Sequence, residues 1–352
     1  MEFQNLNVFE DEPVAADGKR REYLDGINAL INRLKREEKG HRRDFVTPES
    51  LAARREYYRE EYAKMLGVDK LPKASRETEC VYYGEDDAAK IFRLTVYATD
   101  EVPMYAMLFI PRGVTEGAPL VIAQHGGGGT PELAADMNGK NNYNHMIQRL
   151  LMRGAVVIAP QLLLWAKETI PTAPGHPIDY DRRQLDASLK RFGLSITALE
   201  IRGIMRCIDF GTALPEVDRE RVGMIGLSYG GYFTLHTAAL DTRIKSAFSC
   251  GCFNDRSVYD WCDWTYPSSA YRFADAEIAG LCAPRALYIA VGKQDSVFHY
   301  ESAIPEGERA TEFYRAAGCE NSIRFLAWEG GHTVPEDDEG YNFLFERMKE
   351  NV

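Results

Sequence analysis

Residues 221–240, RVGMIGLSYGGYFTLHTAAL, restrict the fold more than any other stretch of the chain. The apolar run Val222–Leu227 is too short for a buried helix and predicts a strand, whereas the spacing that follows it is helical. Ser228 stands at the junction with a glycine two positions away on each side. A strand that turns directly into a helix at such a serine is a nucleophile elbow, because larger neighbours would collide in that turn. An ordinary glycine-rich turn can carry the same motif. Ser228 is therefore a convincing nucleophile only if a catalytic base and an acid are found elsewhere in the sequence.

Length and charge exclude several classes of protein. The chain has 352 residues, enough for one large α/β domain with additions, and its net charge of −11 argues against nucleic-acid binding and against anionic membranes. No apolar run has the length of a membrane span, and the acidic N-terminus lacks the features of a secretion signal. Seven scattered cysteines are typical of reduced thiols. We therefore expect a cytoplasmic protein, with a homo-oligomer as one option.

The chain divides into a helical extension at residues 1–78 and a main domain at residues 79–352. Residues 1–18 are interpreted as a surface or flexible arm, and residues 19–66 have helical patterning with many charges. A second helix is expected to open at residues 47–50 and to continue to Leu66. Acidic residues are interleaved with the basic clusters of this extension, which favours a solvated helix face over a partner-binding surface.

The sequence pattern of the main domain predicts an α/β fold with a mostly parallel central sheet of about eight strands flanked by helices. Short turns join its first strands, which indicates an antiparallel start, and continuously apolar strands then alternate with helices. The connections at residues 161–192 and 251–282 are longer than necessary and are interpreted as insertions that shape a substrate site. The expected strands cover residues 80–83, 91–98, 104–110, 120–124, 155–159, 222–227, 244–250, 286–291 and 323–328.

In a parallel sheet, catalytic and ligand-binding residues lie at the carboxyl ends of the strands. Ser228 follows one apolar strand, Asp295 follows the strand at residues 286–291, and His332 follows the last strand after two glycines. This order predicts a serine nucleophile, an orienting acid and a histidine base. His299 is the strongest rival to His332, because it lies four residues after Asp295.

Four glycines follow His125 at the end of another strand. No Gly-Lys-Ser/Thr follows them, which argues against a phosphate-binding P-loop. We interpret the glycines as an oxyanion loop, because they let backbone N–H groups face a negative oxygen. The predicted donors are the N–H of Tyr229 and the N–H of Gly126 or Gly127, while His125 is expected to shape the loop.

These motifs resemble those of α/β-hydrolases over about residues 79–350. Residues 198–231, ALEIRGIMRCIDFGTALPEVDRERVGMIGLSYGG, resemble the acetyl xylan esterase and dienelactone-hydrolase-like branch of that fold. The resemblance implies a serine esterase that deacetylates carbohydrate or another small ester through an acyl-enzyme and needs no metal or other cofactor. Dienelactone hydrolases proper use a cysteine nucleophile, so Ser228 argues against their specific reaction.

Two other functions remain open at this point. Amides can be cleaved by the same three residues, so a peptidase of the prolyl oligopeptidase type is an alternative, although such relatives usually carry a large N-terminal propeller. A non-enzymatic binding protein on a hydrolase scaffold is the third hypothesis. Trp165, Trp261 and Trp264 are candidate substrate-binding residues, because aromatic rings can stack on sugars, and packing within a cap is their alternative role.

Overall fold

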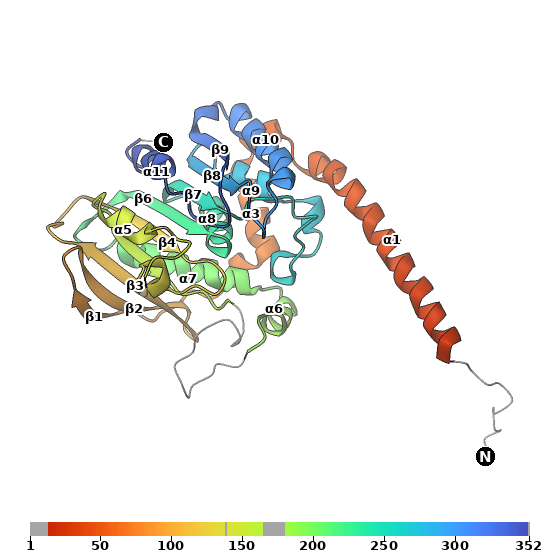
Figure 1. The fold of residues 1–352 in the computed structure, drawn as a ribbon, viewed down its shortest axis with the longest axis horizontal. Helices are drawn as coiled ribbons and strands as arrows, with labels where there is room; N and C mark the ends of the chain where they lie inside the picture. The colour runs from red at the N-terminus through yellow and green to blue at the C-terminus, as the bar shows by residue number, and fades with distance from the viewer. Residues whose placement is uncertain (1–12, 138, 165–179, 351–352) are drawn as a thin grey trace, which may run out of the picture.

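The computed structural model describes residues 13–137, 139–164 and 180–350, and Figure 1 shows their arrangement. A sheet of nine strands runs through the main domain in the order β1-β2-β3-β5-β4-β6-β7-β8-β9. The expected mixed sheet is confirmed, with nine strands instead of about eight. The strands are β1 (Glu79–Glu85), β2 (Ala89–Thr99), β3 (Val102–Pro111), β4 (Ala118–Gln124), β5 (Val156–Pro160), β6 (Val217–Leu227), β7 (Ile244–Cys250), β8 (Ala286–Gly292) and β9 (Ile323–Trp328).

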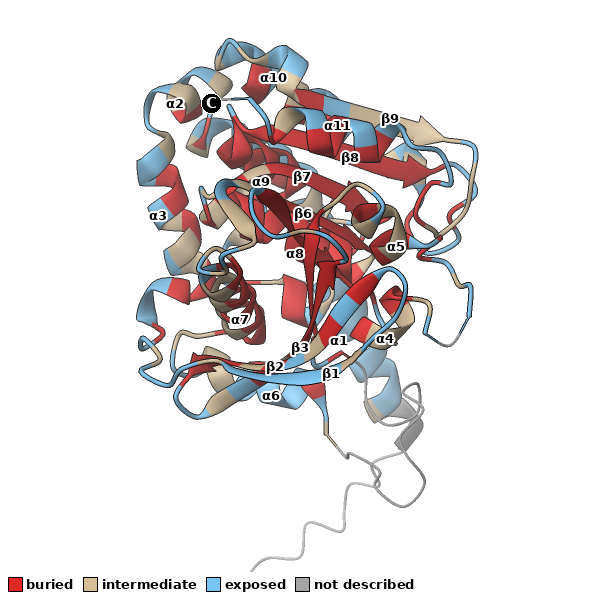
Figure 2. Cartoon of the chain, turned by 90° about the vertical axis from the view of Figure 1, so that its left-hand side faces the viewer, coloured by how far each residue is buried: buried red, intermediate tan, exposed pale blue. Residues whose placement is uncertain are grey.

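Pairing changes from antiparallel to parallel along the sheet. β1, β2, β3 and β5 pair antiparallel in succession, and every pair from β5 through β4 to β9 is parallel. β1 lies at the edge and is largely exposed, whereas β8 is buried along its whole length (Figure 2). β4 and β5 are likewise completely buried. The parallel part therefore carries the predicted site residues at one common end of the sheet.

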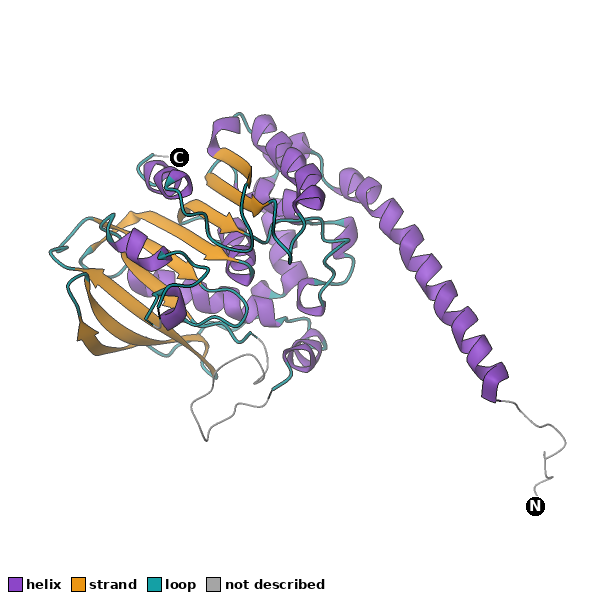
Figure 3. Ribbon diagram, viewed as in Figure 1, coloured by secondary structure: helices purple, strands orange, loops and turns teal. Residues whose placement is uncertain are grey.

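Helices cover both faces of the sheet, as Figure 3 shows. Leu120 and Ile122 of β4 contribute to the core shared with α7 to α10, whereas Val121 and Ala123 contribute to the opposite core with α5 and α11. Alternate side chains of one strand thus fill two cores, which explains the continuously apolar sequence. These helices are α4 (Pro131–Ala134), α5 (Met146–Leu151), α6 (Arg182–Lys190), α7 (Ile196–Gly211), α8 (Tyr229–Leu240), α9 (Asp275–Cys282), α10 (Tyr300–Ala316) and α11 (Glu339–Arg347).

The N-terminal region consists of α1 (Pro13–Phe45), α2 (Pro48–Ala53) and α3 (Arg55–Leu66). The first half of α1 projects from the body and only its second half reaches the main domain (Figure 1). The helix already begins at Pro13, within the expected arm, whose residues 1–12 lie outside the described residues. The single helix expected after residue 47 is divided at Arg54, whose φ of −132° and ψ of 36° are not helical.

Both expected insertions contain regular structure among their described residues. α6 lies in the 161–192 connection, and the 251–282 connection holds two short 3-10 turns and α9. Sequence patterning missed α6 and α9. In the ranges 13–137, 139–164 and 180–350, no helix combines the length and the apolar character needed to cross a bilayer.

Gly230 provides a test of how tightly the elbow helix packs on the sheet. A Cβ at this position would overlap the backbone carbonyl of Gln124, and backbone cannot move aside as a side chain can. We expect Gly230→Ala to lower the free energy of unfolding by about 3 kcal/mol, measured by denaturant titration. Gly26→Ala in exposed α1, where a Cβ meets nothing within 4 Å, is the matched control and should not destabilise the protein. Equal stability of the two variants would contradict the prediction.

Candidate active site

The elbow forms where β6 ends at Leu227 and α8 begins at Tyr229. Ser228 has φ 61° and ψ −122°, a backbone conformation that residues other than glycine rarely adopt. Its N–H donates to Cys250 O at 2.9 Å. A Cβ on Gly226 would overlap the backbone of Gly230. The glycines of the motif are therefore required by close approach of the backbone, and the strained serine is held by the neighbouring strand β7.

Asp295 and His332 meet at the carboxyl ends of β8 and β9. Asp295 Oδ2 accepts from His332 Nδ1 at 2.8 Å, and Asp295 Oδ1 accepts from the N–H groups of Val297 and Phe298. Burial raises the pKa of Asp295, but the hydrogen bond from His332 and that from the Phe298 N–H outweigh it, so the net pKa lies below the usual value. An ionised Asp295 fixes the proton on Nδ1 and leaves Nε2 as the basic nitrogen.

His332 lies beside the loop that holds the elbow. A Cβ on Gly251 would be 3.5 Å from His332 Cε1, and Gly251 directly follows the carbonyl that binds the Ser228 N–H. The rival His299 is exposed at the start of α10. The structure therefore brings the predicted serine, acid and histidine to the ends of β6, β8 and β9.

The glycine loop is organised by buried His125. His125 Nε2 accepts from the Leu162 N–H at 2.9 Å, and Nδ1 lies 2.8 Å from Gly126 O, to which it donates in the neutral tautomer. Burial lowers the pKa of His125 to about 4. These contacts agree with the expected structural role of His125.

Gly126 is packed against the elbow, but its N–H has another partner. Its Cβ would be 3.0 Å from Ser228 Cβ, while its N–H donates to Tyr143 Oη at 2.8 Å. The Gly126 N–H, which the sequence predicted as a possible oxyanion donor, is therefore already used in this hydrogen bond. Of the two glycines predicted for this role, the exposed Gly127 is therefore the better candidate.

The three tryptophans differ in their surroundings. Trp165 lies outside the described residues. Trp261 is half-buried, and its ring stacks on Tyr229 with centroids 5.6 Å apart. Trp264 is only 5% exposed and is stacked on Tyr232 at 4.7 Å. Trp264 is thus a packing residue beneath the surface and not an exposed platform at the rim, in agreement with the alternative role considered for it.

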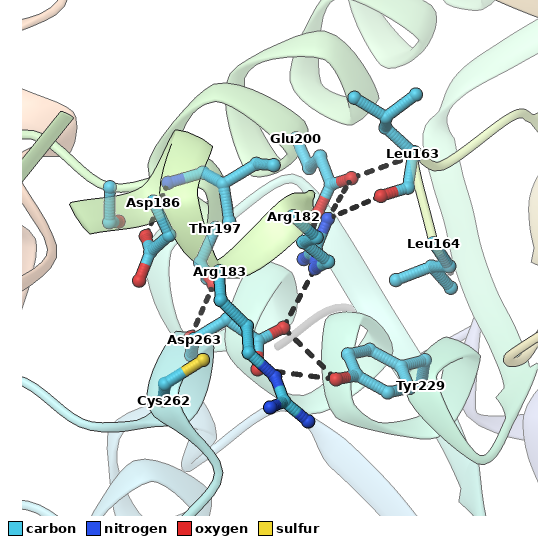
Figure 4. A network of polar contacts seen from close by, with 12 residues as sticks. Leu163, Leu164, Arg182, Arg183, Asp186, Thr197, Glu200, Tyr229, Cys262 and Asp263 are labelled. Atoms are coloured by element: carbon cyan, nitrogen blue, oxygen red, sulfur yellow. Dashed lines mark hydrogen bonds and ion pairs between the residues drawn. The ribbon is translucent and has the colours of Figure 1, made fainter. Parts of the chain in front are cut away.

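A buried polar network, shown in Figure 4, lies behind the elbow and was not found by sequence reasoning. Tyr229 Oη donates to Asp263 at 3.0 Å, and Asp263 accepts from Arg182 Nε at 2.8 Å. Arg182 also donates to both carboxylate oxygens of Glu200, at 2.9 and 2.8 Å. The network joins α6, α7, the second insertion and the residue after the nucleophile. Ion pairs connect the two insertions to each other and to α7, and the hydrogen bond from the Tyr229 hydroxyl connects them to the elbow.

Metal ligation has no obvious candidate in the described part of the chain. Residues 13–137, 139–164 and 180–350 contain no group of three or more His, Cys, Asp or Glu side chains that could hold a metal ion. Cys250 and Cys252, the closest pair in sequence, are buried free thiols.

A serine elbow after β6, an acid after β8 and a histidine after β9, on a sheet of this order, are the arrangement of α/β-hydrolases. The chain belongs to the acetyl xylan esterase family, because the model of the Acetyl xylan esterase (AXE1) family matches residues 56–254. The matched range includes Ser228 and ends before Asp295 and His332. It begins within the predicted 1–78 extension, so a boundary at residue 78 stays a prediction.

Individual relatives are more distant. YtaP of Bacillus subtilis (strain 168), provisionally named a hydrolase, is 30% identical in an alignment of 136 residues, and the match covers 36% of this chain and 46% of YtaP. This chain thus aligns with less than half of its curated relative.

Three solved structures share the fold at low sequence identity. A Bacteroides fragilis NCTC 9343 protein, provisionally described as an acetyl xylan esterase, has a TM-score of 0.65 at 14% identity and covers 85% of this chain and 83% of its own. A glucuronoyl esterase from Solibacter usitatus has a TM-score of 0.60 at 16% identity, with coverages of 87% and 95%. Acetyl xylan esterase 1 from Thermoanaerobacterium sp. JW/SL YS485 has a TM-score of 0.55 at 16% identity, with coverages of 83% and 93%.

His125 makes stability depend on pH. Its pKa is about 4 in the folded protein and about 6.5 in an unfolded chain, so between these values the unfolded chain binds more protons. Stability from this residue is complete above about pH 6.5 and decreases as the pH falls toward 4, by on the order of 3 kcal/mol. The difference in unfolding free energy between the wild type and His125→Asn should therefore shrink over this range. The same substitution at exposed His299 is the control, and a difference that does not change with pH would refute the prediction.

Arg182 is expected to be essential for stability, because it neutralises two buried carboxylates. Arg182→Met leaves Glu200 and Asp263 without their cation and should lower the free energy of unfolding by about 3–5 kcal/mol. Arg183→Met, at the exposed neighbouring position of α6, should change it by less than about 0.5 kcal/mol. Chemical denaturation of both variants checks the prediction, which fails if the two lose similar stability.

Proposed function

We propose that this protein is a serine esterase that removes small acyl groups, acetyl above all, from carbohydrate esters through an acyl-enzyme. The observation that carries the proposal is the strained Ser228 at the elbow, together with the His332–Asp295 pair at 2.8 Å on neighbouring strand ends. Membership of the acetyl xylan esterase family supports the reaction class. The names of the solved relatives, acetyl xylan and glucuronoyl esterases, support carbohydrate esters as substrates.

In the first half of the reaction, Ser228 Oγ attacks the ester carbonyl carbon while its proton moves to His332 Nε2. Asp295 keeps the imidazole oriented and stabilises its positive form. The tetrahedral intermediate collapses when its bond to the leaving oxygen breaks, and His332 gives its proton to that alcohol. An acyl ester on Ser228 remains.

In the second half, His332 removes a proton from water as the water oxygen attacks the acyl carbonyl. The bond between that carbon and Ser228 Oγ then breaks, the proton returns to Oγ, and the carboxylic acid leaves. The Gly127 N–H and the N–H of Tyr229, the first residue of α8, are the proposed oxyanion donors. One such donor contributes about 3 kcal/mol to the transition state.

Among the described residues, half-buried Trp261 is the aromatic candidate for contact with a sugar ring, and the role of Trp165 stays a prediction. Its stacking on Tyr229 brings it next to the residue that follows the nucleophile. A substrate ring held there would lie near the elbow, because Tyr229 is bonded to Ser228 in the chain.

Replacement of the nucleophile tests the proposal directly. Ser228→Ala should reduce the hydrolysis of p-nitrophenyl acetate and of acetylated xylo-oligosaccharides at least about 10³-fold, because the acyl-enzyme can no longer form. Ser322→Ala, before the amino end of β9, is the control and should retain activity. Near-normal turnover by folded Ser228→Ala would disprove the assignment, and faster cleavage of aminoacyl-proline amides than of acetylated sugars by the wild type would favour the peptidase alternative.

A further inference from the structure

Residues 142–144, between α4 and α5, contact both the glycine loop after β4 and the histidine loop after β9. In the sheet, β6, β7 and β8 lie between these two strands. Four strand spacings, about 19 Å, therefore separate the strands that carry the two loops. A segment that holds both loops can fix the oxyanion donors and the base relative to each other.

The Tyr143 hydroxyl lies inside the turn of the glycine loop. It accepts from the Gly126 N–H at 2.8 Å, and a Cβ on Gly129 would overlap it, so this hydroxyl requires glycine at position 129. Gly126 O closes the turn by accepting from the Gly129 N–H at 3.1 Å. Burial raises the pKa of Tyr143 to about 12, so the phenol stays neutral near neutral pH. Gly127, the proposed oxyanion donor, lies in the chain between the two glycines that contact this hydroxyl.

Asn142 and Asn144 hold the loop that contains His332. Asn142 Nδ2 donates to His332 O at 3.2 Å, and the Asn142 carbonyl accepts from the Val334 N–H at 3.0 Å. Asn144 Nδ2 donates to Thr333 Oγ1 at 2.6 Å and to Val334 O at 2.5 Å. These hydrogen bonds fix the backbone at the base itself and at the two residues that follow it.

The segment has an uncommon backbone conformation at its end. Asn144 and His145 are consecutive residues with φ of 48° and 60°, in the left-handed region that residues other than glycine seldom occupy. Tyr143 is only 5% exposed and belongs to the same hydrophobic core as Met146 of α5. Strained conformations persist where many contacts determine them, and they are common at functional sites. The contacts of residues 142–144 therefore define one arrangement of this segment.

We propose that Tyr143 and Asn144 are positioning residues of the esterase reaction, through which one segment sets the oxyanion loop and His332 relative to each other. Neither residue reacts with the substrate. The inference rests on the proposed function and adds to it a part that sequence patterns did not indicate. Loss of the Tyr143 hydroxyl releases the glycine turn, and loss of the Asn144 amide releases the backbone after His332.

The two loops serve different parts of the reaction, so the leaving group distinguishes the two residues. Stabilisation of the oxyanion is needed for every ester. A proton from His332 is needed for the departure of a sugar alkoxide, whereas p-nitrophenolate leaves without one. A displaced His332 should therefore slow the cleavage of acetylated sugars more than that of p-nitrophenyl acetate. A displaced oxyanion loop should slow both reactions by a similar factor.

Tyr143→Phe tests the contact with the oxyanion loop. We expect kcat to fall about 10- to 100-fold for both p-nitrophenyl acetate and acetylated xylo-oligosaccharides, because a small displacement of the donors costs that much. KM should change by less than about threefold, because the lost contacts act in the transition state. The control is Tyr341→Phe in the same core, where the hydroxyl has no hydrogen-bond partner among the described residues. It should keep kcat within about twofold.

Asn144→Gly tests the contact with the histidine loop, because glycine keeps the positive φ but lacks the amide. We expect kcat/KM for acetylated xylo-oligosaccharides to fall at least about fivefold more than kcat/KM for p-nitrophenyl acetate. His145→Gly is the matched control at the next left-handed residue. The exposed side chain of His145 lies 2.6 Å from Asp136 and is not bonded to the histidine loop. This control should leave the ratio of the two substrates unchanged.

The outcomes separate the positioning role from the esterase function. Kinetics of Tyr143→Phe equal to those of Tyr341→Phe, or an unchanged substrate ratio in Asn144→Gly, would overturn the proposal, as would a rise in KM at constant kcat. Chemical denaturation checks that the variants are folded, and should one of them not fold, the result for the other decides. Activity retained by Ser228→Ala would refute the esterase mechanism itself. Unaltered variants of an enzyme that Ser228→Ala inactivates would refute the positioning role alone.

Discussion

Close contact between backbone segments at the start of α8 is the constraint on which the rest of the site depends. Gly226, Gly230 and Gly231 bring three backbone segments so near that a Cβ on any of them would overlap backbone atoms of α8, β4 or β7. The same contacts force Ser228 into its strained conformation and align it with the ends of the neighbouring strands. The position of the nucleophile thus follows from the absence of side chains, whereas the acid and histidine are positioned by hydrogen bonds.

Buried ion pairs position the segments outside the sheet, namely α1, α6 and the second insertion. Arg182 connects α6 to Glu200 of α7 and to Asp263 of the second insertion, and Arg42 connects α1 to Glu277 and Glu306. Buried ion pairs contribute less to net stability than apolar packing of the same volume would, but they tolerate few alternative arrangements. Both networks therefore define where the added segments lie against the domain.

Sequence patterns located the strands and the order of Ser228, Asp295 and His332, because apolar runs and the residues that follow them are local features. The partners of Gly126 and Arg182 could not be predicted in this way. Tyr143 lies 17 residues after Gly126 in a loop, and Asp263 lies 81 residues after Arg182 in a different insertion. Such pairs depend on how distant segments pack, as does the burial of Trp264, and an arginine in a polar helix gives no signal that it will be enclosed.

The nature of the atoms that surround a glycine also determines how this protein can evolve. Gly203 of α7 is restricted by the side chain of Met104, so a smaller residue at position 104 could make room for a larger one at 203. Gly230 is restricted by the carbonyl of Gln124, which is present whatever amino acid occupies that position. A mutation at Gly203 can be compensated by a second mutation, whereas one at Gly230 cannot. Changes in specificity are then expected in the insertions, where side chains such as those of Arg182 and Asp263 make many of the contacts.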